Sequence, residues 1–181
     1  MKTCVFITGT NAVGKTSLAF GIMEAFGGIA ESNKALTRCA DGRVCFAGRY
    51  EYGRKFGGVD GFNATSGLRE VVRLGLEKSE IIFCEGMYLH TFGLNLTNAL
   101  FAAEKQLVCF LYAPASVISQ RLKERSGTKI HTALRQQKAC AASANKWASI
   151  GVPVLAINTG ETKTEDAVEI VKNKALSLCG Q

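Results

Sequence analysis

A glycine-rich segment near the start of the chain is the feature that most restricts its fold. Residues 9–16 read Gly-Thr-Asn-Ala-Val-Gly-Lys-Thr and match the pattern G-x-x-x-x-G-K-[ST] at every fixed position. The apolar run at residues 4–8 predicts a buried strand before this segment, and residues 15–26 predict a helix after it. A strand, a loop of this composition and a helix are together typical of the phosphate-binding loop, or P-loop, of α/β nucleotide-binding proteins.

The residue types of this P-loop suit the binding of a nucleoside triphosphate. Its glycines let the backbone wrap tightly, so that N–H groups point at phosphate oxygens. Lys15 would reach the β- and γ-phosphates, and the Thr16 hydroxyl would ligate Mg²⁺. The predicted nucleotide-binding residues of this segment are Gly9, Thr10, Asn11, Ala12, Val13, Gly14, Lys15, Thr16 and Ser17.

Apolar runs alternate with helical patterns along the rest of the chain. Predicted strands cover residues 35–40, 43–47, 81–84, 107–112 and 152–157, and predicted helices cover 65–78, 91–105, 115–124, 130–149 and 164–177. Asp41-Gly42 between the first two of these strands indicates a β-hairpin. We expect an α/β protein with the three-layer α/β/α fold of P-loop NTPases, in which a mostly parallel sheet carries the hairpin as an added antiparallel element. The whole chain, residues 1–181, is predicted to form one domain.

Cysteine usage and hydropathy exclude several classes of protein. The seven cysteines include no C-x-x-C pair, which argues against a zinc or dithiol redox site. Their odd number, and their places inside apolar runs, favour free thiols in a reducing cytoplasm. No apolar stretch approaches the roughly 18 residues of a membrane span, so we expect no membrane partner.

The basic charge of the chain is concentrated in one region. Lys and Arg number 22 against 15 Asp and Glu, a formal net charge of +7, which favours polyanionic partners. Residues 115–150 hold a single acid, Glu124, beside these seven cations: Arg121, Lys123, Arg125, Lys129, Arg135, Lys138 and Lys146. We interpret residues 115–150 as a helical lid. Arg121 and Arg125, four residues apart on one helix face, would then neutralise charge on a transferring phosphoryl group. The alternative is a solvated basic helix surface.

Other P-loop classes fit the sequence less well than a small kinase. A GTPase would carry an N-K-x-D motif for reading the base, but Asn33-Lys34-Ala35-Leu36 lacks the aspartate. A kinase requires in addition a group that orients or deprotonates the acceptor hydroxyl, for which a carboxylate is the usual choice.

Two carboxylates are candidates for that role. Glu85 follows the predicted strand 81–84 at the carboxyl edge of the sheet, where α/β ligand sites lie, and would orient the acceptor or hold Mg²⁺ through water. Asp60 follows a glycine pair in the loop over residues 48–61 and is the other candidate base. The simpler alternatives are a strand-end carboxylate that caps a loop and a turn residue, respectively.

Further residues are candidates for contact with the two substrates. The stretch 48–58 interleaves cations with aromatic residues, a mixture suited to phosphate contacts and base stacking, although it also fits an exposed loop. The predicted acceptor-binding residues are Arg49, Tyr50, Arg54, Lys55, Asp60 and Tyr88. Asn158 and Thr159 follow the last predicted strand, where, by analogy with this fold, the adenine of the donor rests.

The sequence resembles the nucleoside/nucleotide-kinase-like group of P-loop phosphotransferases, which includes polynucleotide kinases. Three features carry this resemblance: the P-loop, the strand end Cys84-Glu85-Gly86 and the Arg121/Arg125 pair. Gly48-Arg49-Tyr50, followed by Gly57-Gly58-Val59-Asp60, is similar to small phage-encoded P-loop kinases that phosphorylate 5-hydroxymethyl-pyrimidines already in DNA. This resemblance implies ATP and Mg²⁺ as cofactors. It also implies the hydroxymethyl oxygen of a modified base as acceptor, and the host cytoplasm as the location.

Three functions follow, in order of preference. The first is an ATP-dependent kinase acting on 5-hydroxymethyluracil in DNA, whose base would flip out and stack on Tyr50 or Tyr88. The second is a kinase for free nucleosides, nucleotides or another small metabolite. The third is a nucleotide-regulated nucleic-acid-binding protein without phosphotransfer. The sequence leaves the oligomeric state open.

Overall fold

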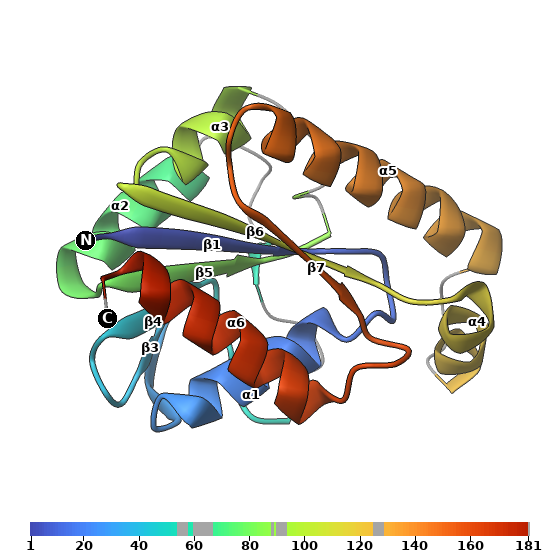
Figure 1. Ribbon diagram of the computed structural model, residues 1–181. Helices are drawn as coiled ribbons and strands as arrows, with labels where there is room; N and C mark the ends of the chain where they lie inside the picture. The colour runs from blue at the N-terminus through green and yellow to red at the C-terminus, as the bar shows by residue number, and fades with distance from the viewer. Residues whose placement is uncertain (54–57, 60–66, 88, 90–93, 125–128, 181) are drawn as a thin grey trace.

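Seven strands form one sheet within the part of the chain that the computed structural model describes, residues 1–53, 58–59, 67–87, 89, 94–124 and 129–180 (Figure 1). The strands are β1 (Thr3–Thr8), β2 (Ile29–Ser32), β3 (Leu36–Cys39), β4 (Val44–Ala47), β5 (Ile81–Glu85), β6 (Lys105–Tyr112) and β7 (Val154–Asn158). Their order is β2-β3-β4-β5-β1-β6-β7. The five strands from β4 to β7 in this order run parallel, whereas β2 and β3 are antiparallel to their neighbours.

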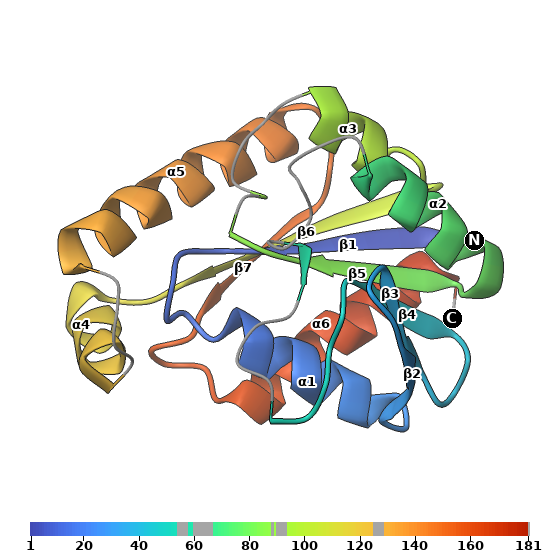
Figure 2. The ribbon, with the colours of Figure 1, turned by 180° about the vertical axis from the view of Figure 1, so that it is seen from behind.

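Helices cover both faces of this sheet. They are α1 (Lys15–Ala25), α2 (Leu68–Lys78), α3 (Leu94–Leu100), α4 (Ala115–Glu124), α5 (Ile130–Ser149) and α6 (Thr164–Leu178). Helices α1 and α6 lie on one face, and α2, α3 and α5 lie on the other (Figures 1 and 2). The expected three-layer α/β/α fold with a mostly parallel sheet is therefore confirmed.

Strand β1 is buried along its whole length because it has neighbours on every side. It pairs with β5 on one edge and with β6 on the other. Val5 and Ile7 point into the core beneath α1 and α6, whereas Cys4 and Phe6 point into the core beneath α2 and α3. Burial of Val5, Phe6 and Ile7 stabilises the fold by roughly 1.5–3 kcal/mol for each side chain. The continuous apolar run of β1 thus fixes the root of the loop that follows it.

The predicted hairpin forms, but its role in the sheet differs from the expectation. The side chain of Asp41 accepts a hydrogen bond from the Arg43 N–H at 2.9 Å in the turn between β3 and β4. Strand β4 also pairs in parallel with β5 and is therefore part of the central sheet, so the view of the hairpin as a mere addition is wrong for β4. The antiparallel extension consists instead of β3 and β2. Strand β2 escaped prediction because it is short and half polar.

The expected helix over residues 91–105 is wrong at its C-terminal end. Helix α3 ends at Leu100, a turn follows, and Lys105 already belongs to β6. The Lys105 N–H donates to the Lys2 carbonyl at 3.0 Å, and Lys105 is the register partner of Thr3. The helical segment therefore ends before Lys105, because β6 pairs with β1 from this residue on. Residues 91–93 lie outside the described residues.

Helix α5 is a wall of the core, which contradicts the interpretation of all of residues 115–150 as a lid. Trp147 and Cys140 are buried against the sheet. Nearer the start of α5, the amide of Gln137 pairs with the backbone of Ala113, accepting from its N–H at 3.0 Å and donating to its carbonyl at 3.1 Å. The helix is therefore attached to the end of β6 as well as to the face of the sheet. No helix in the described part of the chain combines the length and apolar character that crossing a membrane requires.

Candidate functional site

The loop between β1 and α1 has a backbone shaped to hold an anion. Gly14 has a φ of 90° and Ala12 a φ of 64°, a left-handed conformation that is uncommon for a residue other than glycine. A Cβ atom on Gly9 would lie 2.5 Å from the carbonyl oxygen of Leu111, so only glycine fits there. Helix α1 begins at Lys15 without a side-chain cap among the described residues, and its positive end faces the loop.

The P-loop lysine lies folded over this loop. Lys15 is buried, and its Nζ donates to the Thr10 carbonyl at 3.0 Å. The Thr10 hydroxyl in turn donates to the Ala133 carbonyl at 2.8 Å, which attaches the P-loop to α5. Thr16 is half-buried and Ser17 exposed at the start of α1. The contact of these residues with a nucleotide stays a prediction.

A cavity of about 350 Å³ opens beside the P-loop. Four parts of the chain form its walls: the P-loop with the first turn of α1, the end of β6, the end of α4, and the turn between β7 and α6 with the first turn of α6. The lining residues are Ala12, Val13, Gly14, Ser17, Leu18, Leu111, Arg121, Glu124, Thr159, Thr162, Lys163, Thr164 and Ala167. Sequence reasoning did not single out Glu124 or residues 162–164 for this cavity. The polar turn after the last predicted strand was the available signal.

Arg121 joins two of these walls. Its guanidinium donates to the Ala12 carbonyl at 3.3 Å, to the Thr159 hydroxyl at 3.1 Å and to the Thr159 carbonyl at 2.7 Å. The planar group is therefore fixed between the P-loop and the turn after β7. Asn158, by contrast, does not line the cavity, because its side chain accepts from the Gly160 N–H at 3.1 Å. A contact between Arg121 and a transferring phosphoryl group stays a prediction, and Arg125 lies outside the described residues.

Glu85 lies at the carboxyl edge of the sheet, next to the strand that leads into the P-loop. Its Cα is the register partner of Ile7, and the carboxylate is buried. The Tyr50 hydroxyl donates to Glu85 Oε2 at 3.0 Å. The backbone at Gly58 packs directly against this residue, since a Cβ there would lie 2.8 Å from the same oxygen.

Tyr50 does not have the position expected of a stacking surface. Its side chain is 1% exposed, and its ring packs edge-on against Phe20 of α1 and Phe46 of β4, with centroids 5.7 and 5.5 Å away. A ring enclosed in this way offers no free face to a nucleic-acid base, so the prediction of base stacking on Tyr50 is wrong. The hydrogen bond from Tyr50 to Glu85 was not foreseen, because it depends on packing between distant segments.

The remaining predicted acceptor-binding residues divide into two groups. Arg49 is exposed and its Nε donates to the carboxylate of Glu51 at 2.8 Å. Arg54, Lys55, Asp60 and Tyr88 lie outside the described residues. The described part of the chain contains no group of three His, Cys, Asp or Glu side chains that would hold a metal ion by themselves.

Comparison with known proteins gives similarity in structure rather than in sequence. No protein-family model matches the chain, and no curated protein matches its sequence. The solved structure of the YorR protein from Bacillus subtilis, in complex with phosphorylated GDP, is 14% identical with a TM-score of 0.58 and 96% coverage of each chain. Deoxyadenosine kinase from M. mycoides with bound dCTP is 12% identical, with a TM-score of 0.53 over 98% of this chain and 100% of that one.

A sugar kinase from Janibacter sp. is similar in structure to the same degree, with 15% identity and a TM-score of 0.52 over 98% of this chain and 96% of that one. Similarities at this level of identity concern the arrangement of strands and helices. Together with the P-loop between β1 and α1, they show that the chain has the fold of the P-loop kinases.

Proposed function

We propose that the chain is an ATP-dependent kinase that transfers the γ-phosphoryl group to an acceptor hydroxyl. The observation that carries this proposal is a P-loop and a buried carboxylate at one edge of the sheet. Glu85 is paired in register with Ile7, which lies two residues before the P-loop begins. A triphosphate held by the loop and a hydroxyl beside Glu85 would then meet at this edge. The kinases among the structural neighbours support this reading.

The donor nucleotide would occupy the cavity beside the P-loop. Its base would lie against Arg121 and Thr159, and its phosphates would extend toward Lys15 and the first N–H groups of α1. The Thr16 hydroxyl and the Glu85 carboxylate would supply the oxygen ligands that Mg²⁺ prefers, the carboxylate acting directly or through water. Bound Mg²⁺ would neutralise charge on the β- and γ-phosphates.

The transfer needs one proton acceptor. The acceptor oxygen forms a bond to the γ-phosphorus, while the bond between that phosphorus and the β–γ bridging oxygen breaks. ADP leaves with the electron pair of the broken bond, and the hydroxyl proton passes to a carboxylate. Glu85 and Asp60 both remain candidates for this base.

DNA that contains 5-hydroxymethyluracil is the acceptor we propose. The resemblance to phage-type kinases supports a modified base as the acceptor. The surface of α5 supports DNA, rather than a free nucleoside, as the molecule that carries this base. Arg135, Lys138 and Lys146 share one exposed face of this helix, and its twenty residues include no acid. Because α5 is fixed to the core and its basic face is exposed, this charge suits a polyanion outside the nucleotide cavity.

A kinase for free nucleosides or nucleotides is the second candidate. The observation that favours it is the structural similarity to a deoxyadenosine kinase with bound dCTP and to a protein solved with phosphorylated GDP. Such an enzyme would use the same P-loop and cavity, and the basic face of α5 would have no part in acceptor binding.

An acceptor screen with ATP labelled at the γ-phosphate separates these functions. The acceptors are duplex DNA with 5-hydroxymethyluracil, the same duplex with thymine, and free nucleosides and nucleotides, including 5-hydroxymethyl-deoxyuridine. We expect label in the modified duplex alone and a loss of about 10²-fold or more in Lys15→Ala. Label in the free compounds alone would contradict the DNA acceptor, and binding of ATP and DNA without any labelled product would contradict the kinase.

A further inference from the structure

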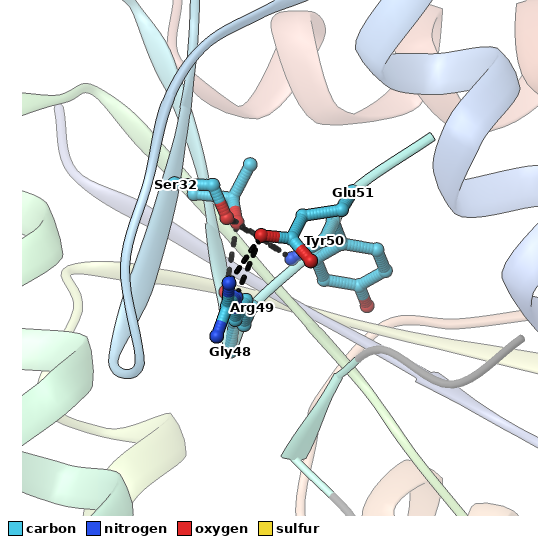
Figure 3. Close-up of polar contacts among 6 residues, drawn as sticks. Ser32, Gly48, Arg49, Tyr50 and Glu51 are labelled. Carbon is cyan, nitrogen blue, oxygen red and sulfur yellow. Dashed lines mark hydrogen bonds and ion pairs between the residues drawn. The ribbon is translucent and has the colours of Figure 1, made fainter. Parts of the chain in front are cut away.

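The antiparallel strands β2 and β3 reach the segment that follows β4 through two hydroxyl groups. The Thr37 hydroxyl, fully buried in β3, donates to the Gly48 carbonyl at 2.9 Å. A hydroxyl has one proton, so Thr37 Oγ1 must accept from its other neighbours: the Ser32 hydroxyl at 2.8 Å and the Tyr50 N–H at 2.9 Å. The Tyr50 N–H also lies 3.2 Å from Ser32 Oγ (Figure 3).

These contacts fix the backbone at the point where the chain leaves the sheet. Gly48 has a φ of 102°, and a Cβ there would lie 2.3 Å from the Gly58 carbonyl oxygen, so this turn requires glycine. Figure 3 shows the Tyr50 ring pointing away from Ser32, on the other side of its own backbone. The ring is thereby directed to its place between Phe20 and Phe46, from which its hydroxyl meets Glu85.

The Tyr50 ring also links Glu85 to the helix that begins with the P-loop lysine. Phe20, which contacts the ring, belongs to α1, and α1 starts at Lys15. Tyr50 therefore lies between the helix that would hold the triphosphate and the carboxylate on the acceptor side. A donor hydrogen bond to one oxygen of a carboxylate restricts its rotation and so defines the direction of the other oxygen.

We propose that Tyr50 is a positioning residue for Glu85, and that β2 and β3 hold Tyr50 in place through Thr37 and Ser32. This inference rests on the proposed kinase function. A misplaced catalytic carboxylate slows the transfer without weakening the binding of ATP, because the nucleotide contacts lie in the P-loop and the neighbouring cavity. Tyr50 thus acts on the rate through another residue and does not itself touch the substrates.

The test compares Tyr50→Phe with Tyr52→Phe in steady-state kinetics of the full chain. Tyr50→Phe keeps the ring and removes the hydroxyl, and we expect kcat to fall about tenfold or more while KM for ATP stays within about twofold. Tyr52→Phe is a matched control, since it also removes a hydroxyl that contacts a carboxylate, that of Glu24, but on the exposed surface. We expect the kcat of this control to equal that of the unmodified chain.

A second pair of variants tests the contribution of β3. Thr37→Val removes the hydroxyl and keeps the shape, so kcat should fall in the same way as in Tyr50→Phe. Thr37→Ser retains the hydroxyl, so its kcat should stay close to that of the unmodified chain. Circular dichroism and thermal unfolding of these four variants and of Glu85→Gln establish that each is folded before its kinetics are compared.

Three results would overturn the inference. One is an unchanged kcat in Tyr50→Phe when Glu85→Gln is inactive, which would leave Tyr50 a core residue only. Another is a loss of rate accompanied by a matching rise in KM for ATP, which would indicate general loosening of the site. The third is an unmodified chain that phosphorylates no acceptor; this result contradicts the proposed function itself and is recognised before any variant is compared.

Discussion

Arg121 connects two walls of the nucleotide cavity through a single side chain. Its three hydrogen bonds reach the Ala12 carbonyl and both the hydroxyl and the carbonyl of Thr159. Lysine carries the same charge but cannot reproduce the planar fork of guanidinium donors. At this position the geometry of the donors therefore matters more than the charge.

We expect Arg121→Lys to weaken ATP binding by about tenfold, the effect of losing roughly one to two hydrogen bonds. Isothermal titration calorimetry with ATP, or with ADP, measures the change. Lys123→Ala is the matched control, because Lys123 is exposed on the same helix and does not line the cavity. Equal affinities of Arg121→Lys and the unmodified chain would show that the cavity does not hold the donor nucleotide.

Sequence reasoning at the residue scale succeeded where one short motif contains its own structural context. The P-loop was located because a strand, a glycine loop and a helix follow each other within residues 4–26. The environment of Tyr50 was beyond such reasoning. Its burial depends on Phe20 and Phe46, and its partner Glu85 belongs to a strand that is far along the chain.

Helix α5 combines a buried face with a basic exposed face. Cys140, Ala144 and Trp147 pack toward the sheet, whereas Arg135 and Lys138 are exposed and form no ion pair within the described residues. The net positive charge of the predicted lid segment was correctly counted from the sequence. The interpretation of all of this segment as a lid was wrong, because the number of charges in a segment does not show which of its helices packs on the sheet.

For this element we expect Arg135→Ala and Lys138→Ala each to weaken DNA binding to a similar extent for every sequence. Each lost phosphate contact should lower the slope of log affinity against log salt concentration by about one. Fluorescence anisotropy with labelled duplex at several salt concentrations measures this slope. Lys174→Ala on α6, across the sheet from α5, is the control. If all three variants behave like the unmodified chain, α5 is not the DNA-binding surface.

Element boundaries were predicted well where local pattern and pairing agree. The start of α1 and the hairpin turn at Asp41 follow from residue type alone. The end of α3 and the strand β2 do not, because both depend on hydrogen bonds to distant strands. For the same reason the sequence did not reveal that β4 joins the parallel sheet.

At the scale of the whole molecule, burial favours the neutral form of several thiols. Burial raises the pKa of Cys39, Cys45 and Cys109 from an ordinary 9.0 to about 12. These groups bind protons more tightly in the folded chain than in the unfolded one. The stability that they contribute is complete below about pH 9 and is lost as the pH rises toward 12.

We therefore expect the free energy of unfolding to decrease between pH 9 and 12, as measured by urea unfolding at a series of pH values. Lysine and tyrosine side chains also titrate there, so the comparison that isolates one thiol is with Cys109→Ala. This variant is less stable at neutral pH, because it creates a cavity, but its stability should fall less steeply above pH 9. If the free energy of unfolding falls equally steeply with pH in Cys109→Ala and in the unmodified chain, a raised pKa of Cys109 is contradicted.

The central place of β1 in the sheet matters while the chain is being synthesised, because both of its partner strands are made later. β1 ends at Thr8, but its partners β5 and β6 begin only at Ile81 and Lys105. At about 5–20 residues per second, roughly 4 to 15 s pass before β5 starts to emerge from synthesis. Until then an apolar segment with two open edges precedes a complete P-loop motif. Since Thr10 also bonds to Ala133, a nascent chain halted before that residue would carry the entire motif without the support that shapes it.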